Sequence, residues 1–289
     1  MRHRPSHLRY TLPIMDDHLI TTPIRALLLG LCLVVGSCLT GCEATGLSYE
    51  SLYEGFFGDE PPPTPSVAVA MMFNRNDADD RRAGISWIAA SPFGHEEEYL
   101  NAYRLFVDDA DPGVRAAAAT ALGRHGTVAD AIILATMLKD EDDLVGWQAA
   151  DGLRKLHNPE VVEALLERLD PDVEEDADTR ATAALALGQY ADPVVFSRLV
   201  AALEQSDFNV VRASHQSLTL ITGIDKGIDP QAWAKWFEQT DTPFANQKQY
   251  TYWLYKRNRG WWDENVTFWN NFDDAEPNGS QVPKGLGGG

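Results

Sequence analysis

Residues 111–123, DPGVRAAAATALG, decide the fold of this chain. Asp111 is a residue type that caps helix N-termini, and Pro112 suits the first helical turn, where its missing N–H costs nothing. An alanine-rich stretch with high helix propensity follows, and Gly123 is typical of a helix end. Small alanine side chains let a neighbouring helix approach closely. The stretch therefore predicts a short helix that packs against other helices.

The same pattern recurs along the chain. Residues 143–153 read DLVGWQAADGL and residues 178–188 read DTRATAALALG, with weaker copies at 80–85 and 210–214. The copies at 143–153 and 178–188 begin with a helix-capping aspartate and continue with alanine residues, and the two weaker copies keep only part of this pattern. Five copies predict a repeat architecture, because chance seldom produces one pattern so often in a single chain.

The spacing of the copies identifies the repeat class. Five positions are taken as equivalent: Arg82, Arg115, Gly146, Arg180 and Arg212. Their spacings are 33, 31, 34 and 32 residues. Second amphipathic segments lie between them, at 96–107, 128–138, 160–169 and 194–203. A period in the low thirties that carries two helices per unit is typical of a helical solenoid.

This pattern resembles the HEAT repeat family, in the short alanine-rich branch that is also found in phycobilin lyases. It is similar to HEAT-repeat lipoproteins of planctomycete-like bacteria. The resemblance implies an all-α, right-handed α-α superhelix of about five helix pairs over residues 73–223. Residues 224–273 are expected to form a capping helix and an aromatic tail that covers the last repeat. Residues 274–289, rich in Gly and Pro, are predicted to be disordered.

The N-terminus carries export signals. Arg25 precedes 14 apolar residues, fewer than the roughly 20 that span a membrane as a helix. Residues 39–42, LTGC, resemble the bacterial lipobox, in which the cysteine receives a diacylglycerol and becomes the new N-terminus. The sequence predicts a lipoprotein signal peptide at 1–41 and a lipid anchor at Cys42. A plain signal peptide or an uncleaved short anchor are the alternatives, and Met15 is a second candidate start.

The residues after the lipobox predict a spacer. Residues 42–72 include the run PPPTP at 61–65, and proline density of this kind gives an extended, semi-rigid tether. Together with the anchor, the tether would hold the stack away from a membrane. The protein is therefore expected to be exported and attached to the cell membrane or the outer membrane, facing the periplasm or the exterior.

The charge of the chain limits its partners. There are 24 Lys and Arg against 43 Asp and Glu, a formal net charge of −19. Such a surface repels nucleic acid and anionic membrane faces. Basic peptides, polycations or divalent metals are compatible with it. The acidic run at 170–178 could hold calcium, but it lacks the glycine of an EF-hand loop, so a solvated loop is the favoured interpretation.

No catalytic arrangement of residues stands out. His125 and His157 occupy matching places in successive repeats, too far apart to share a metal, and structural or surface roles are favoured for them. The chain is predicted to be a monomeric, non-catalytic scaffold without a cofactor or metal. A protein partner is expected on a concave face lined by the second helices. The residues assigned to partner binding are Arg115, Arg180, Arg212 and Trp147.

The aromatic tail leaves two other functions open. Trp253, Trp261 and Trp262 could form an exposed surface that stacks on sugar rings, which would make the protein a cell-wall or glycan-binding module. The favoured alternative is that they pack as part of the cap. An accessory role of the bilin-lyase kind is a third reading, implied by the family resemblance alone.

Overall fold

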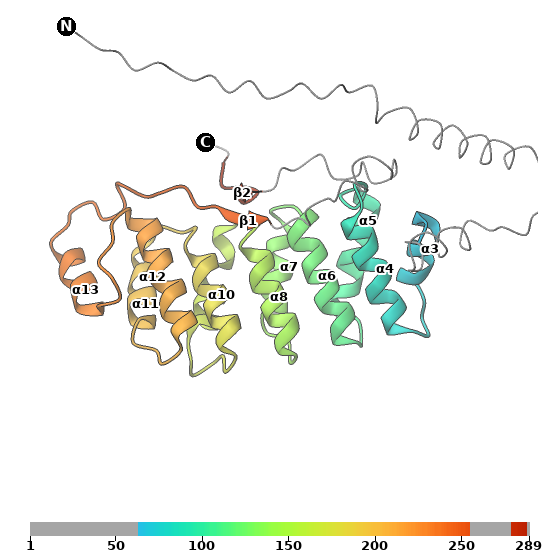
Figure 1. Cartoon of the computed structure of the whole chain (residues 1–289), viewed down its shortest axis with the longest axis horizontal. Coiled ribbons are helices and arrows are strands. Elements are labelled where there is room, and N and C mark those ends of the chain that lie inside the picture. Colours follow the sequence, from blue (N-terminus) through green and yellow to red (C-terminus); the bar gives the residue numbers. More distant parts are fainter. Residues whose placement is uncertain (1–62, 255–278, 288–289) are drawn as a thin grey trace, which may run out of the picture. The chain divides into compact units, whose positions relative to one another are not determined.

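The chain folds into a row of paired helices (Figure 1) in a computed structural model that describes residues 63–254 and 279–287. The first helices of the pairs are α4 (Ala78–Ala90), α6 (Pro112–His125), α8 (Asp143–Leu153), α10 (Ala177–Leu187) and α12 (Phe208–Thr222). The second helices are α5 (Glu97–Leu105), α7 (Asp130–Met137), α9 (Val162–Leu169), α11 (Pro193–Ala202) and α13 (Pro230–Glu238). The predicted all-α stack of five pairs is confirmed.

Shorter elements complete this order. Helix α3 (Pro65–Met72) precedes the first pair, and 3-10 turns lie at η1 (Phe106–Asp108) and η2 (Pro159–Val161). Within the described ranges, no helix is long and apolar enough to cross a membrane. The predicted signal peptide, the lipidation site Cys42, and Trp261 and Trp262 lie outside the described residues.

Every first helix begins at an aspartate whose side chain accepts backbone N–H groups of the first turn. These caps are Asp77, Asp111, Asp142, Asp176 and Asp207. Their spacings are 34, 31, 34 and 31 residues. Four residues after each cap stand Arg81, Arg115, Gly146, Arg180 and Val211. The predicted equivalence of Arg82 and Arg212 with Arg115 is therefore wrong by one residue, because the caps, rather than the arginines, set the register.

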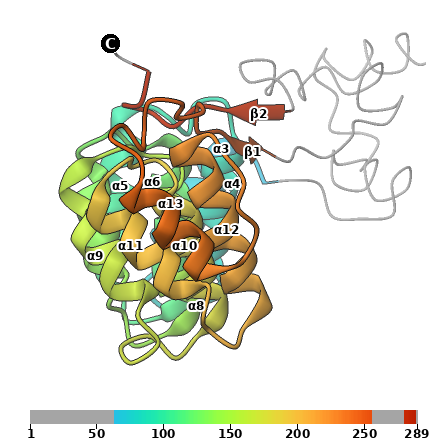
Figure 2. The same cartoon turned by 90° about the vertical axis from the view of Figure 1, so that its left-hand side faces the viewer.

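Small residues bring the first helices into backbone contact. Ala118, Ala119 and Ala121 of α6 are fully buried. A Cβ atom on Gly123 would lie only 2.5 Å from Cα of Gly152 on α8, so these two helices touch without intervening side chains. Viewed along the stack, the first helices form one row and the second helices the other (Figure 2). The alanine-rich pattern thus has the packing role predicted for it.

The N-terminal end of the stack starts earlier than the sequence predicts. Thr64 caps α3 and Pro65 occupies its first turn. Met72 is fully buried, and a Cβ atom on Gly84 of α4 would overlap its backbone nitrogen. Residues 65–72 of the predicted tether therefore form helix α3, which covers the first repeat as a terminal cap must.

The predicted aromatic cap at the other end is present in α13. Trp233 is fully buried and its Nε1 donates to the carbonyl oxygen of Gly227 at 2.7 Å. The ring of Phe237 stacks on Phe196 of α11 with centroids 4.3 Å apart. These contacts cover the apolar side of α11 that an open stack would expose.

The chain then returns along the stack. Strand β1 (Tyr252–Leu254) pairs antiparallel with β2 (Gly279–Gln281), with Trp253 opposite Ser280. Beyond β2, Lys284 forms a parallel bridge with Leu156. The prediction of disorder over 274–289 is thus wrong for residues 279–287, which are held by backbone hydrogen bonds. Residues 274–278 and 288–289 lie outside the described residues.

Candidate protein-interaction surface

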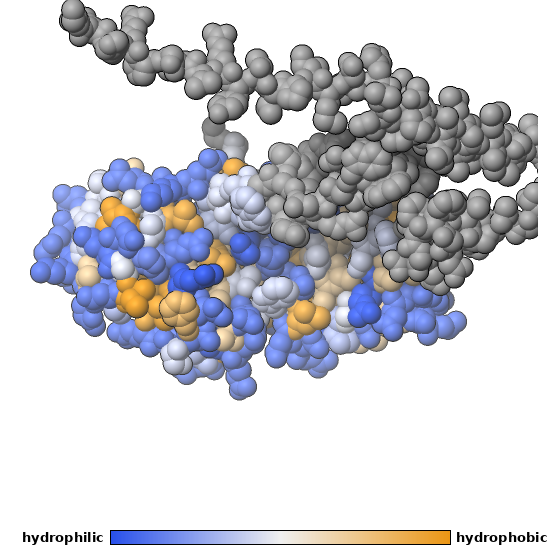
Figure 3. Space-filling model, in the orientation of Figure 1, coloured by the Kyte–Doolittle hydropathy of each residue, from blue (hydrophilic) through white to orange (hydrophobic). Residues whose placement is uncertain are grey.

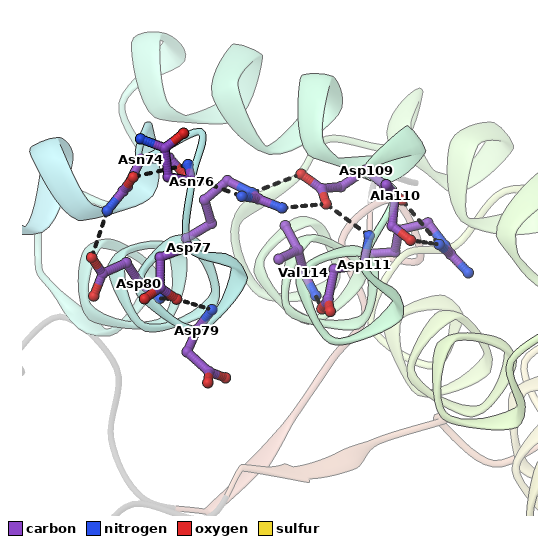
Figure 4. Close-up of polar contacts among 11 residues, drawn as sticks. Asn74, Asn76, Asp77, Asp79, Asp80, Asp109, Ala110, Asp111 and Val114 are labelled. Carbon is purple, nitrogen blue, oxygen red and sulfur yellow. Dashed lines mark hydrogen bonds and ion pairs between the residues drawn. The ribbon is translucent and has the colours of Figure 1, made fainter.

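A ladder of arginines links consecutive repeats. Arg115 lies in the first turn of α6 and donates through Nε and Nη2 to Asp140 of the next repeat, at 2.8 and 2.7 Å. Its Nη1 donates to the carbonyl oxygen of Asp109 at 2.9 Å. Arg81 repeats this arrangement one pair earlier, with bonds of 2.9 and 2.8 Å to the Asp109 carboxylate and 3.0 Å to the carbonyl of Asn74. Each such set of arginine contacts between repeats is here called a rung. Asp109 takes part in two successive rungs, because its carboxylate accepts from Arg81 and its carbonyl oxygen accepts from Arg115 (Figure 4).

Arg180 forms the corresponding rung in the fourth repeat. Its Nη1 donates to the carbonyl oxygens of Glu174 and Glu175 at 2.7 and 2.8 Å, and its Nε donates to Oε1 of Gln205 at 3.0 Å. Two of the predicted partner-binding residues, Arg115 and Arg180, are thus committed to contacts between repeats. The side chains of Arg115 and Asp140 are only 11% and 13% exposed.

The acceptor of each rung stands two residues before an aspartate cap, as Asp109, Asp140, Glu174 and Gln205. The first three also accept the backbone N–H of the cap residue itself. Sequence reasoning missed these acceptors, although the recurrence of an acid or amide two residues before each cap was a readable signal.

The two aspartate acceptors, Asp109 and Asp140, have lowered pKa values. Burial raises the pKa of the Asp140 carboxyl, but the hydrogen bonds from Arg115 and from the backbone of Asp142 outweigh burial, so the net pKa is lowered. The pKa of Asp109 is lowered in the same way, with Arg81 overcoming the effect of burial. Both carboxylates are therefore charged at neutral pH and hold their arginines.

The remaining two predicted residues come together elsewhere. Trp147 of α8 and Arg212 of α12 line one open depression of about 290 Å³ on the first-helix row. Its other lining residues come from the same row: Asp178, Ala181, Thr182, Leu185, Asn209, Ala213 and Gln216. The depression lies on the first helices, whereas the sequence places the partner on the second helices. The second-helix row has an open depression of its own, about 350 Å³, lined by α9, α11 and their flanking turns.

Arg212 differs from the ladder arginines in its surroundings. It is exposed, and it forms no ion pair or hydrogen bond with the described part of the chain. Trp147 is 36% exposed, a large fraction for a tryptophan in a packed stack. Phe208 and Leu144, on the first turns of α12 and α8, are also exposed. Figure 3 shows small hydrophobic patches among hydrophilic side chains on one face of the molecule.

His125 and His157, which occupy matching places in successive repeats, have different surroundings. Nε2 of His125 lies 2.6 Å from the carbonyl oxygen of Ala89 in the preceding repeat. The ring of His157 stacks on Tyr190 at 4.8 Å, and burial lowers its pKa. In the described ranges, no group of three or more His, Cys, Asp or Glu side chains is placed to hold a metal ion.

The acidic run at 170–178 serves local structure. Arg168 donates to the Glu174 carboxylate at 3.2 Å, and Asp176 caps α10. In the tail, Tyr250 is buried and Trp253 is 69% exposed. Trp253 is therefore the one predicted aromatic-surface residue that the described ranges place, and it faces solvent.

Stacked helix pairs joined by a side-chain ladder define a helical-repeat solenoid protein. The chain belongs to the HEAT repeat family: the pattern of HEAT repeats matches residues 66–154 and 133–219, together more than half of the 289 residues. This matches the resemblance inferred from the alanine-rich helices.

Several solved structures are similar to this chain, and two of them are described here. A designed armadillo repeat protein, YIII(Dq)4CqI, is 16% identical with a TM-score of 0.44, over 63% of this chain and 90% of that chain. YibA of Escherichia coli is 20% identical with a TM-score of 0.44, over 78% of this chain and 88% of that chain. No curated protein matches the chain.

Proposed function

We propose that this protein is a non-catalytic HEAT-repeat scaffold, anchored in the cell envelope by a lipid at Cys42, which binds a protein partner on its first-helix row. One observation carries the proposal. Trp147 and Arg212 line the same open depression, and Arg212 is not used by the ladder that occupies Arg115 and Arg180. A repeat scaffold presents an extended surface of the kind used for protein interaction.

The chemistry of the depression fits a protein partner. Trp and Arg are the residue types that most often dominate binding energy at protein interfaces. The lining includes two small, buried residues, Ala181 and Ala213, and the polar residues Asp178 and Gln216. An open volume of about 290 Å³ is at or below the lower end of small-molecule pockets, which enclose most of their ligand. It fits one anchoring side chain of a protein.

Site-specific crosslinking tests the proposed surface. A photo-crosslinking amino acid at position 147 should capture a discrete partner from the membrane fraction of the native cells. The same amino acid at Arg198, on the exposed side of α11 in the second-helix row, is the control. Capture from position 198 alone would move the interface to the second row and contradict the proposal.

Matched tryptophan variants then measure the contribution of the depression. Trp147→Ala should weaken binding of the captured partner about 30-fold, the effect of losing roughly 2 kcal/mol at an interface anchor. Trp87→Ala is the control, because Trp87 lies on α4 outside the depression and is 43% exposed. Equal losses in the two variants would show that the depression is not the binding site.

The anchor is tested separately from binding. Cells fed a clickable fatty acid should label the wild-type protein, and Cys42→Ala should remove the label and release the protein from membranes. Unchanged labelling would contradict the anchor and leave the binding surface untouched.

A glycan-binding function has one observation in its favour, the exposure of Trp253 on β1. An exposed indole can stack on a sugar ring. Sedimentation with purified cell wall distinguishes the two functions: Trp253→Ala would abolish co-sedimentation if the wall is the ligand, and Trp147→Ala would not.

A further inference from the structure

The segment 282–287 contacts the ends of the second and third repeats in the way that a bound peptide contacts a protein. Two of its partners, Gly126 and Lys155, lie more than a hundred residues away in the sequence. None of residues 279–287 belongs to the hydrophobic core. The segment is therefore held by local polar contacts and close fit, which are the contacts that recognise a ligand.

The Lys284 ammonium group is held by two backbone carbonyl groups. Its Nζ donates to the carbonyl oxygens of Arg124 and Gly126, at 3.2 and 2.9 Å. These carbonyls lie at the C-terminal end of α6, where the helix dipole is negative and the last carbonyls lack partners within the helix. An ammonium group carries three donors and a full positive charge, so it satisfies two such carbonyls together.

The backbone of the segment adds to an edge of the third repeat. The N–H of Lys284 donates to the carbonyl oxygen of Lys155 at 2.9 Å, and the N–H of His157 donates to the carbonyl oxygen of Lys284 at 2.8 Å. Pro283 is buried beside this pairing. Pairing of an extended segment with an exposed backbone edge is a general mode of peptide recognition.

Glycine is required directly after the lysine. Gly285 has φ of +93°, a conformation that other residues rarely adopt. A Cβ atom at this position would lie 2.8 Å from both the carbonyl oxygen of His157 and Cγ2 of Val128. The close approach excludes a residue with a Cβ atom at this position. Together with the carbonyl groups that hold the ammonium, it makes the site selective for a lysine followed by glycine.

We propose that residues 124–128 and 155–157, here called the edge site, form a binding site for an extended peptide with a Lys-Gly pair. In the folded protein the chain's own segment 282–287 occupies this site. Because the segment is attached outside the core, a peptide of the same sequence can replace it. This inference is independent of the proposed function, since the edge site lies at helix ends and shares no residue with the first-helix depression.

The experiment uses the full chain with the segment dislodged. Gly285→Val introduces the clash and should release residues 282–287 without disturbing the stack. A fluorescein-labelled peptide of residues 279–289 is then titrated and followed by anisotropy. We expect it to bind the Gly285→Val chain at least ten-fold more tightly than the wild type, whose site is filled. A peptide with Lys284→Met should bind the variant at least five-fold more weakly.

A matched glycine in the same segment controls for nonspecific effects. Gly287 has no neighbour within 4 Å of an added Cβ, so Gly287→Val should leave the site filled and behave as wild type. Circular dichroism establishes that each variant keeps its helices. If Gly285→Val proves unstable, Lys284→Met in the full chain removes the ammonium contacts to Arg124 and Gly126 without adding volume.

Hydrogen exchange gives a second readout. The amide of His157 should be protected in the wild type and exchange at least ten-fold faster in Gly285→Val, with protection restored by the added peptide. Equal exchange in the two chains, or equal peptide affinity for them, would overturn the proposal.

Discussion

The second and third repeats join to their neighbours in different ways. In the second, Arg115 reaches forward to Asp140 and closes a rung that is almost fully shielded from solvent. In the third, Gly146 stands where the arginine would be, and the acceptor Glu174 is instead held by Arg168 at 3.2 Å. The first, second and fourth repeats thus carry a crossing arginine, whereas the third has a joint that lacks it.

The same comparison separates arginines that hold neighbouring repeats together from arginines that are free to contact a partner. An arginine four residues after a cap is drawn into the ladder, as with Arg81, Arg115 and Arg180. Arg212 stands one residue further along its helix and points to the surface depression instead. Position relative to the cap, rather than residue type, therefore distinguishes the two roles.

The largest expected effect comes from breaking a rung. Arg115→Ala leaves the nearly buried Asp140 carboxylate without its cationic partner and should lower the free energy of unfolding by about 2–4 kcal/mol. Urea unfolding followed by circular dichroism measures it. Arg212→Ala, outside the ladder, should stay within about 0.5 kcal/mol of wild type. Similar losses in both variants would contradict the division into two kinds of arginine.

The backbone contact between α6 and α8 should be the next most sensitive joint. Gly123→Ala places a methyl group against Gly152 and should cost about 1–3 kcal/mol through overpacking. Thermal unfolding compares it with Gly113→Ala, whose added Cβ would meet only side-chain atoms, of the cap Asp111 at 3.1 Å and of Arg82 at 3.4 Å, and no backbone. A neutral Gly123→Ala would mean that the two helices can separate at little cost.

Acid should weaken the rungs selectively. The pKa values of Asp109 and Asp140 are lower in the folded chain than the value near 4 of a free aspartate. Their contribution to stability is therefore complete above about pH 4 and is lost as pH falls through the folded pKa values. Unfolding midpoints measured from pH 7 to pH 3 should fall less steeply for Arg115→Ala than for wild type. Parallel curves would show that the rung carries no pH dependence.

The smallest effect is expected at the joint without an arginine. A Cβ atom on Gly146 would meet only the carbonyl oxygen of Leu138, at an ordinary 3.5 Å. Gly146→Ala should therefore stabilise the chain by about 0.5–1 kcal/mol, because alanine favours the helix. Differential scanning calorimetry measures the change. A loss of stability would indicate that the third repeat needs the flexibility of glycine.

Local patterns were sufficient to predict the stack. Aspartate caps, alanine-rich helices and apolar spacing are properties of neighbouring residues, and they placed the five first helices and four of the second helices; the fifth second helix, α13, was predicted as the capping helix. The same kind of signal was present for α3, because Thr64 and Pro65 form a helix start. The preceding prolines nevertheless led to the prediction of a spacer there. The register slipped by one residue because arginines at two different positions were aligned with one another.

The contacts that could not be predicted join distant parts of the sequence. The pairing of Lys284 with Lys155 and Gly126 depends on where the stack ends and on how the chain returns. The sequence around residue 284 is rich in Gly and Pro, which are common in disordered segments. At the candidate surface, Trp147 and Arg212 could be chosen from their residue types, but their meeting in one depression required the stacking of α8, α10 and α12.

The length of the loop closed by Lys284 has a consequence for the order of folding. Ladder rungs join residues 25 to 28 apart, whereas Lys284 reaches Gly126 across 158 residues. Short loops close at lower entropic cost, and synthesis supplies the N-terminal repeats first. The repeats can therefore assemble before the last residues exist. During that interval the edge site of every newly made molecule is empty, and its backbone groups are open to any Lys-Gly segment in the surroundings.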